Sequence, residues 1–334
     1  MNEALINTGF EKAAMPKMKS QKPKPPSPRA KAMLAGLRST SSSRSRNPPA
    51  GPGSSLSSPR FKLQKSRSQH FLTDASVLEG EAEALDVRGE AVLEIGSGDG
   101  RLSERLLARE PSSLTLVELD PKWAEHLKEK FGGKRSVMVV QADFLSLPDD
   151  LAISRIAGNI PYQITSPILL KLGRMKFSKA VLCVQKEVAE RMTASAGSSE
   201  YGRLSVFAQL RFDLQTLAQV PRSSFTPPPK VDSSIVCLMP KNGAASLPAS
   251  LDLVTAALFS HRLQTIPQAL VHARRLWAWD KDKARAQARK LKMDDIRVFQ
   301  LTPEQFVQIT RLLPVPAAAR PSRHATAQQS RNSG

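Results

Sequence analysis

Short apolar runs alternate with stretches of helical period through the middle of the chain. The apolar run 92–95 stops at a glycine-rich loop, and Leu102, Leu106 and Leu107 then recur on one side of a helix expected over 101–109. The pattern continues with strands expected at 114–119, 136–141, 153–157, 179–184, 212–220 and 234–239, and helices at 122–131, 166–172, 187–193 and 204–210. This alternation predicts an α/β fold with a mainly parallel sheet, helices on both faces and a hairpin-like finish.

The sequence on either side of this region has a different pattern. A helix running to Leu85 precedes it, with Asp74 as the expected N-cap. After Pro240 the periods are helical only, at 251–262, 265–277, 281–291 and 303–313, and the last helix opens with the capping box Thr302-Pro-Glu-Gln305. We therefore expect a Rossmann-like sheet domain over 64–240 and a small all-helical domain over 241–313.

Both ends of the chain have the composition of unfolded segments. Residues 1–63 are rich in Ser, Pro, Lys and Arg, and residues 314–334 in Ala, Pro and Arg, so a disordered basic leader and a flexible tail are expected. The leader has three interpretations: a nucleic-acid-binding arm, an organelle transit peptide or a misassigned start. The early acids Glu3 and Glu11 disfavour a transit peptide, so a cytoplasmic location is favoured over a mitochondrial one.

The charge points to a polyanionic partner. The formal net charge is +19, and residues 1–68 hold fourteen Lys or Arg against two acids, which places +12 of that charge in these N-terminal residues. Cys183 and Cys237 are the only cysteines and the five histidines are scattered, so neither a disulfide framework nor a metal site is expected. No apolar run approaches the roughly 20 residues that a membrane-spanning helix needs.

Candidate binding residues follow successive predicted strands. Gly96-Ser-Gly-Asp-Gly100 differs from the dinucleotide spacing and lacks the Lys-Ser/Thr ending of a triphosphate loop. Glu118 ends the next run, where a carboxylate suits ribose hydroxyls, and Asp143 after the following strand suits an adenine amino group. For either acid taken alone a helix cap is the favoured interpretation, and the agreement of the two favours a pocket. Because the carboxyl ends of parallel strands meet at one edge, Gly96, Gly98, Glu118, Asp143 and Asn159 are expected to line one pocket for an adenosyl cofactor, S-adenosyl-L-methionine first.

The stretch Asn159-Ile-Pro-Tyr162 carries the sharpest chemistry. The exocyclic amine of a base is a poor nucleophile because its lone pair is delocalised into the ring. The Asn159 side-chain oxygen and the Ile160 carbonyl can accept both amine hydrogens and draw the nitrogen towards tetrahedral geometry. Pro161 fixes the turn, and Tyr162 offers a stacking face worth about 1–3 kcal/mol per base. Methylation of a base amine is therefore expected, with no low-pKa general base.

Further motifs extend this pattern along the chain. They are Gln69-His-Phe-Leu72, Glu94-Ile-Gly-Ser-Gly-Asp-Gly100, Val117-Glu-Leu-Asp120, Gln141-Ala-Asp143, Val184-Gln-Lys-Glu-Val188, Tyr201-Gly-Arg-Leu-Ser205 and Phe225-Thr-Pro-Pro-Pro-Lys-Val-Asp-Ser233. In this order, and with the Asn159 motif, they resemble the KsgA-type rRNA adenine dimethyltransferases, which are related to the Erm resistance methyltransferases. The resemblance is close from about residue 65 to 240 and looser over the helical tail.

The resemblance implies a class I methyltransferase fold and roles for particular residues. It implies S-adenosylmethionine contacts at His70, Leu72, Gly96, Glu118, Asp143 and Asn159, and stacking of Phe225 on a flipped adenine opposite Tyr162. The implied substrate is a pair of adjacent adenosines in the 3′-terminal hairpin of small-subunit rRNA, each dimethylated. The implied partner is the pre-assembled small ribosomal subunit, bound by a monomer whose helical domain docks the RNA.

Two stretches depart from the family pattern. Ser68 stands where a glycine is usual, and 261–268 lacks the usual cations at Leu263, Gln264 and Pro267. Fewer phosphate contacts are expected there, and Pro267 is expected to interrupt a helix. The basic leader is one candidate substitute for the lost contacts.

Three other functions stay open. An Erm-like enzyme acting on large-subunit rRNA is disfavoured by the Asn159 and Gln69 motifs. An assembly or transcription factor with weak or no methylation is disfavoured by the intact acids and Asn159–Tyr162. A small-molecule methyltransferase is disfavoured by the basic charge and by Phe225 with its following prolines.

Overall fold

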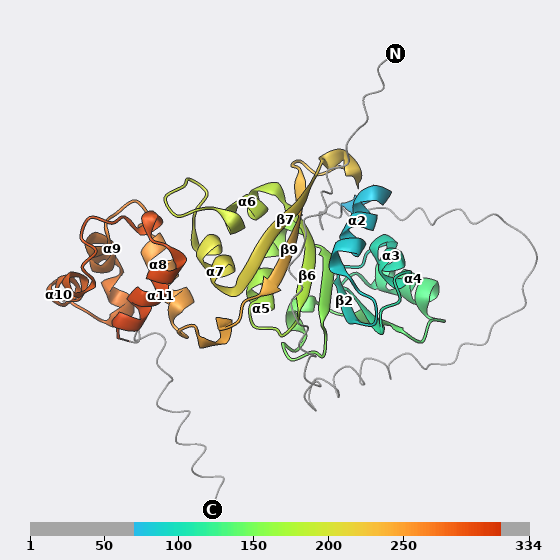
Figure 1. The fold of residues 1–334 in the computed structure, drawn as a ribbon, viewed down its shortest axis with the longest axis horizontal. Helices are drawn as coiled ribbons and strands as arrows, with labels where there is room; N and C mark the ends of the chain where they lie inside the picture. The colour runs from blue at the N-terminus through green and yellow to red at the C-terminus, as the bar shows by residue number, and fades with distance from the viewer. Residues whose placement is uncertain (1–69, 315–334) are drawn as a thin grey trace, which may run out of the picture. The chain divides into compact units, whose positions relative to one another are not determined.

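The computed structural model describes residues 70–314 (Figure 1). The predicted leader 1–63, the residues Ser68 and Gln69, and all of the predicted tail except Pro314 lie outside this range. The described chain divides by its contacts into two units. The first holds the described residues up to Lys186 together with Gln215–Pro240, and the second holds Glu187–Leu214 and the described residues from Lys241 on.

A seven-stranded sheet forms the first unit, in the order β4-β3-β2-β5-β6-β9-β7. The strands are β2 (Ala91–Ile95), β3 (Ser113–Glu118), β4 (Val137–Gln141), β5 (Arg155–Asn159), β6 (Lys179–Gln185), β7 (Phe212–Val220, in this unit from Gln215 on) and β9 (Ser233–Pro240). The pairs β2–β3, β2–β5, β3–β4 and β5–β6 are parallel, and β6–β9 is antiparallel. The predicted α/β fold with a mainly parallel sheet is confirmed.

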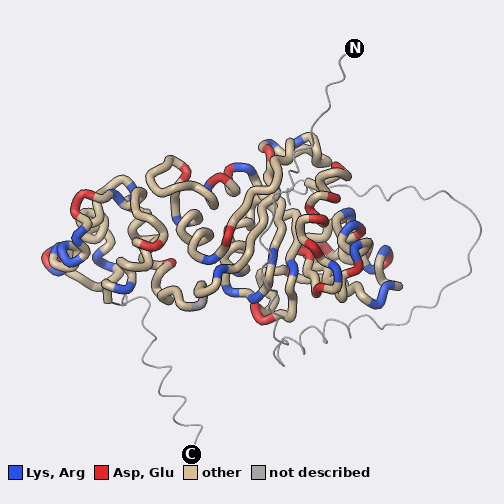
Figure 2. Tube along the Cα trace, in the orientation of Figure 1, with Lys and Arg blue, Asp and Glu red and all other residues tan. Residues whose placement is uncertain are grey.

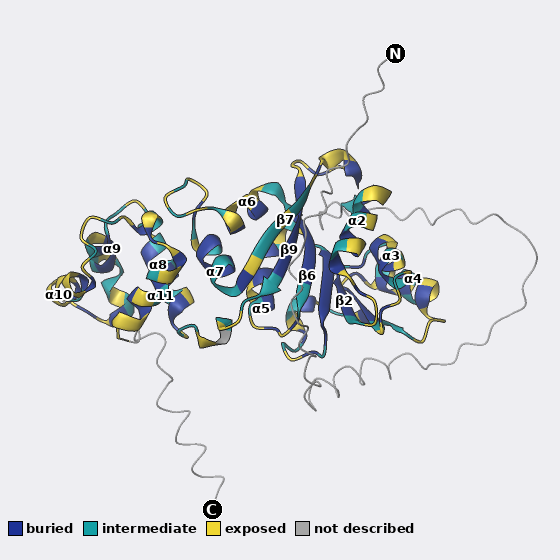
Figure 3. Cartoon of the chain, in the orientation of Figure 1, coloured by how far each residue is buried: buried dark blue, intermediate teal, exposed yellow. Residues whose placement is uncertain are grey.

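Helices between the strands supply the rest of this unit. They are α2 (Ala75–Leu85), α3 (Arg101–Leu107), α4 (Pro121–Phe131) and α5 (Thr165–Leu172). The inner strands β2, β3, β5, β6 and β9 are mostly buried, whereas the edge strands β4 and β7 and the outer sides of the helices keep more accessible residues (Figure 3). Leu78, Leu106, Leu116 and Val181 belong to one core cluster, because the helices place their apolar residues against the sheet.

A second, two-stranded sheet ties the start of the described chain to a distant loop. In it β1 (Phe71–Leu72) runs antiparallel to β8 (Phe225–Thr226), with Leu72 opposite Phe225. Asp74 extends the link: its Oδ1 accepts from the Ser76 and Val77 amides as the predicted N-cap of α2, and its Oδ2 accepts from the Ser224 hydroxyl at 3.2 Å. Residues 70–74 and 224–227 therefore form one joined segment.

The second unit is helical. It contains α6 (Lys186–Thr193) from Glu187 on, α7 (Arg203–Arg211), α8 (Leu251–Phe259), α9 (Ile266–Ala273), α10 (Lys281–Leu291) and α11 (Pro303–Leu312). The capping box at Thr302 and Gln305 is present as predicted. Among the described residues, no helix is both long and apolar enough to cross a bilayer.

The sequence predicted a sheet domain up to residue 240 and a helical domain after it. The two units of the structure differ from this prediction in one segment. Residues 187–214 were placed in the sheet domain, but they belong with the C-terminal helices. The segment packs into the helical core through Tyr201 and Val206, each 1% exposed, and the Tyr201 hydroxyl donates to the Leu301 carbonyl at 2.8 Å. The strand–helix alternation carries no signal for such a packing choice.

Some predicted boundaries shift. The helix expected over 101–109 ends at Leu107, and the strand expected over 153–157 extends to Asn159. The expectation that Pro267 interrupts a helix is wrong. It lies in the first turn of α9, after the Thr265 cap, where a proline removes no helical hydrogen bond.

Replacing Tyr201 by Phe removes the hydroxyl and leaves the buried Leu301 carbonyl without its partner. The free energy of unfolding of the helical unit should fall by about 1–2 kcal/mol. Urea unfolding monitored by tryptophan fluorescence measures this, since Trp277 and Trp279 stack in the same core at 4.9 Å. An unchanged unfolding midpoint would contradict the assigned role of the hydroxyl.

Candidate active site

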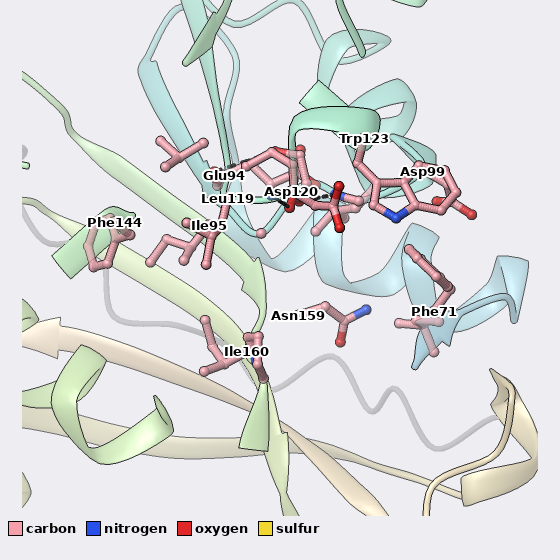
Figure 4. A pocket seen from close by; sticks show the side chains of 18 of the residues that line it. Phe71, Glu94, Ile95, Asp99, Leu119, Asp120, Trp123, Phe144, Asn159 and Ile160 are labelled. Atoms are coloured by element: carbon pink, nitrogen blue, oxygen red, sulfur yellow. Dashed lines mark hydrogen bonds between the residues drawn. The ribbon is translucent and has the colours of Figure 1, made fainter. Parts of the chain in front are cut away.

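A cavity of about 400 Å³ lies at the carboxyl ends of the central strands (Figure 4). All the site residues predicted from the sequence line this cavity: His70, Leu72, Gly96, Gly98, Glu118, Asp143, Asn159, Ile160, Pro161, Tyr162 and Phe225. These residues come from β1, the ends of β2, β3, β4 and β5, and β8, so the fold gathers distant segments into one pocket. Their individual roles remain proposals.

The glycine loop follows β2 and turns sharply into α3. The Gly96 amide donates to the Val117 carbonyl at 2.8 Å, and the Gly100 amide donates to the Ser97 carbonyl at 2.9 Å. Gly98 has a φ of +51°, and a Cβ there would lie 2.8 Å from the Phe71 ring. Only glycine satisfies both the backbone conformation and the close approach of the ring.

Glu118 is held by the loop that it faces. Its Oε2 accepts from the Gly98 amide at 2.9 Å, and its Oε1 accepts from the Asp120 amide at 2.8 Å. The residue is 8% exposed, and burial raises the pKa of its carboxyl above the usual value despite these hydrogen bonds. Each carboxylate oxygen can accept more than one hydrogen bond, so the group can also take hydroxyl donors from a ligand.

Asp143 follows β4 and is the second acid proposed for the cofactor. Its side chain is exposed. Its Oδ1 caps the short helix η2 (Phe144–Ser146) by accepting from the Leu145 amide at 2.9 Å. The helix-cap alternative and the pocket alternative both hold for this residue, because it caps η2 and also lines the cavity.

Lys171 fastens the loop that carries Asp143. It lies on α5 and is 1% exposed, and its Nζ donates to the Leu145 and Leu147 carbonyls and to Asp149 Oδ1 at 2.9 Å. A buried ammonium with oxygen partners on one loop resists displacement of that loop, because moving it would leave the charge unpaired. The sequence did not single out Lys171.

Asn159 is the last residue of β5. Figure 4 shows its side chain directed into the pocket, between Ile160 and Phe71. The Ile160 amide donates to the Cys183 carbonyl at 3.1 Å, which holds the following turn against β6. The motif therefore presents its amide to the cavity from a fixed strand end.

Tyr162 follows this turn and is half-buried. Its hydroxyl shares a 2.8 Å hydrogen bond with the Ser233 hydroxyl, and its ring lies near His70, with centroids 6.1 Å apart and planes inclined by 26°. Burial raises the pKa of the Tyr162 phenol above its usual value of 10, so the group stays protonated at neutral pH. Tyr162 is suited to stacking and not to accepting a proton.

Phe225 sits deeper than its expected stacking role requires. It lines the pocket but is only 5% exposed, and it belongs to the same hydrophobic core as its register partner Leu72. Phe225 and Tyr162 therefore line the same pocket, but the Phe225 ring does not expose a broad face to it.

Sequence reasoning missed an aromatic wall of the pocket. Phe71 and Trp123 pack with ring centroids 5.0 Å apart, and Leu119 is 58% exposed at the same cavity. Phe71 could have been found, because it stands between His70 and Leu72, which were both nominated. Trp123 gave no signal, since an aromatic residue on an amphipathic helix reads as core.

Two buried carboxyls lie in the core of this unit. Glu81 on α2 is 0% exposed, and neither of its carboxyl oxygens has a hydrogen-bond partner among the described residues. Glu94 on β2 is 2% exposed, lines the pocket, and accepts from the Ser103 hydroxyl at 2.6 Å. Burial raises the pKa of each to about 8, so both are largely protonated at neutral pH.

The pocket fits an adenosyl cofactor by its donor set. A buried carboxylate fixed by two backbone amides, a second acid at the far end, a close-packed glycine loop and apolar walls suit ribose, adenine and an uncharged thioether or sulfonium chain. Together with the sheet order, these features define a Rossmann-like methyltransferase.

The chain belongs to the ribosomal RNA adenine dimethylase family, whose model matches residues 60–311. It is 40% identical over 249 residues to a probable ribosomal RNA small subunit methyltransferase A of Methanopyrus kandleri, covering 72% of this chain and 88% of the relative. It is 37% identical to ribosomal RNA small subunit methyltransferase A of Gloeobacter violaceus, covering 73% and 91%. The resemblance inferred from the motifs is confirmed.

Solved structures agree with this assignment. A dimethyladenosine transferase of Plasmodium falciparum aligns with a TM-score of 0.64 and 28% identity, covering 71% of this chain and 95% of that one. The 23S rRNA methyltransferase ErmE aligns with a TM-score of 0.54 and 28% identity, covering 73% and 99%.

Replacing Glu81 by Gln should flatten the pH dependence of stability. The folded state holds the Glu81 proton up to about pH 8, whereas the unfolded state releases it near pH 4.5, so stability is full below pH 4.5 and is lost as the pH rises towards 8. Removing the group should reduce this slope by up to about 1.4 kcal/mol per pH unit. Urea unfolding from pH 5 to 8 measures it, with the exposed Glu83→Gln on the same helix as control. Equal slopes in both variants would refute the burial argument.

Proposed function

We propose that the chain dimethylates the exocyclic amine of two adjacent adenosines in the 3′-terminal hairpin of small-subunit rRNA, using S-adenosyl-L-methionine. The observation that carries this proposal is the pocket itself. It combines the glycine loop, Glu118 and Asp143 with the Asn159–Tyr162 motif around one cavity of suitable size. The names of the curated relatives support the small subunit as the target.

Glu118 would hold the ribose hydroxyls of the cofactor, and Asp143 its adenine amino group. Gly96 and Gly98 would admit its chain close to the backbone, with His70 and Leu72 at the side formed by β1. When bound, the cofactor supplies an electrophilic methyl group on its sulfonium. The chain's own contribution is to bring an amine to that group in a reactive orientation.

Asn159 and Ile160 would activate the amine. The Asn159 side-chain oxygen and the Ile160 carbonyl accept its two hydrogens and localise the lone pair on nitrogen, and Pro161 keeps the two acceptors in register. Tyr162 would stack on the base, and Phe225 would contribute to the apolar lining of the same pocket. The methylated ammonium is acidic and loses its proton to water, so the protonated Tyr162 phenol is no obstacle.

The same proposal covers the setting of the reaction. The protein would act as a monomer in the cytoplasm on a pre-assembled small ribosomal subunit, with a role in the biogenesis of that subunit. The C-terminal helices would dock the RNA, and a base would leave its stack to enter the pocket.

Replacing Asn159 by Ala should lower the rate of methylation at least about a hundredfold, because the amine loses an acceptor that orients it. Mass spectrometry of small-subunit rRNA nucleosides after incubation with purified enzyme measures dimethyladenosine directly. Asn242→Ala, at an exposed position that does not line the pocket, is the matched control. Near-normal methylation by the Asn159 variant would remove the central claim of the mechanism.

Replacing Glu118 by Ala should weaken cofactor binding about ten- to a hundredfold, because hydrogen bonds to a charged acceptor contribute about 1.5–3 kcal/mol. Calorimetric titration with S-adenosylhomocysteine measures the affinity. Glu110→Ala, an exposed acid before β3, is the control. Unchanged affinity in the Glu118 variant would mean that the ligand binds elsewhere.

A further inference from the structure

The described positive charge is distributed unevenly between the two units. The described part of the first unit has seventeen Lys or Arg and eighteen Asp or Glu, whereas that of the second has fifteen and ten. A polyanionic substrate therefore gains no net attraction from the unit that carries the pocket. Within the described chain, the attraction has to come from the helical unit.

One segment accounts for the whole excess in that unit. Residues 274–292 hold eight Lys or Arg against Asp280 and Asp282, a net charge of +6. Five of these eight cations lie on α10, and Figure 2 shows blue segments at this helix. The excess is therefore local and is not spread over the unit.

The cations of α10 are arranged by face. The helix packs inwards through Ala284, Ala288 and Leu291, which are all buried. Lys281, Arg285 and Arg289 are exposed and recur every four residues, so they form one stripe about 12 Å long. We call these three residues the α10 stripe.

The stripe is only partly neutralised. Arg285 pairs with Asp282 at 3.2 Å in an exposed, weak contact. Within the described part of the chain, no acid forms an ion pair with Lys281 or Arg289. Two cations of the stripe thus keep their full charge for an external partner.

The stretch 261–268 offers no comparable surface. Its one cation is Arg262, whose guanidinium donates to the Ser198 and Ser199 carbonyls and lies 5.5 Å from the Phe299 ring. Arg262 therefore holds a loop of its own unit. Because Arg262 is engaged within its own unit, the stretch 261–268 offers even fewer phosphate contacts than its sequence predicts.

We propose that the α10 stripe binds the phosphate backbone of the substrate RNA, in place of the 261–268 stretch. This inference rests on the proposed function for the identity of the RNA, but the charge argument requires only a polyanion. A membrane surface is the weaker partner, because the apolar residues of α10 are buried and the helix has no exposed apolar face to insert. The contacts give affinity without sequence specificity.

The test compares two double variants of the full chain that lose equal charge from the same helix. Lys281→Gln/Arg289→Gln removes stripe cations, and Lys283→Gln/Lys290→Gln removes exposed cations on the other flank. Glutamine keeps a high helix propensity, so both should fold. Binding to unmethylated small ribosomal subunits is measured from 50 to 300 mM KCl, roughly the range over which such contacts weaken.

The stripe variant should bind about ten- to a hundredfold more weakly near 0.1 M salt, and its slope of log affinity against log salt should fall by about 2. The flank variant should keep the wild-type slope. Equal slopes in the two variants, or no change in either, would overturn the proposal, and the second result would leave the leader as the source of affinity. Stripe-dependent binding to phosphatidylserine vesicles that matches binding to subunits would overturn RNA as the partner.

Measuring methylation distinguishes a failure of this inference from a failure of the proposed function. With saturating subunits the stripe variant should keep the wild-type kcat and show a raised KM. If the wild-type chain formed no dimethyladenosine, the proposed function would fail while the salt slopes still decided the stripe. Thermal unfolding and S-adenosylhomocysteine affinity should match the wild type in both variants.

Discussion

The site depends on one interaction, the pair of hydrogen bonds that backbone amides donate to the Glu118 carboxylate. One amide belongs to Gly98 in the loop after β2 and the other to Asp120 in the loop after β3. A single side chain thus fixes the two loops that border the cavity in one relative position. Because the carboxylate is buried, displacing either loop would leave one of its oxygens without its amide partner in a region of low polarity. The pocket is therefore organised before any ligand enters.

On the other side of the cavity, too, contacts between distant segments hold the pocket residues in place. The two-stranded sheet β1–β8 places Leu72 opposite Phe225, so a residue assigned to the cofactor and a residue assigned to the base share one ladder. Asp74 reinforces this link by bonding both the start of α2 and Ser224. Lys171 does the equivalent for the Asp143 loop from the helix that follows the Asn159 motif. Each loop at the pocket is held by a polar contact to a distant segment.

Several acids of the first unit line the pocket, namely Glu94, Asp99, Glu118, Asp120 and Asp143, and the buried Glu94 is largely protonated at neutral pH. With slightly more acids than Lys and Arg among its described residues, this unit offers no net attraction to RNA. The helical unit supplies the missing positive charge, and the cations of its α10 project from a helix held by small buried alanines. Chemistry and attraction are thus assigned to different parts of the chain.

The sequence alone determined the sheet class and the composition of the pocket. Strand–helix alternation predicted a mainly parallel sheet, and chemistry at successive strand ends identified Gly96, Glu118, Asp143 and Asn159, since parallel strands bring those ends together. Tertiary structure alone decided which unit receives residues 187–214, because that depends on the fit of Tyr201 into the helical core. It also decided that Phe71 and Trp123 form a wall, that Lys171 anchors a loop and that Arg262 is used internally. These outcomes depend on contacts between residues that are distant in sequence. The local periodicity of a sequence indicates which side of a helix or strand is apolar, but not which segment packs against that side.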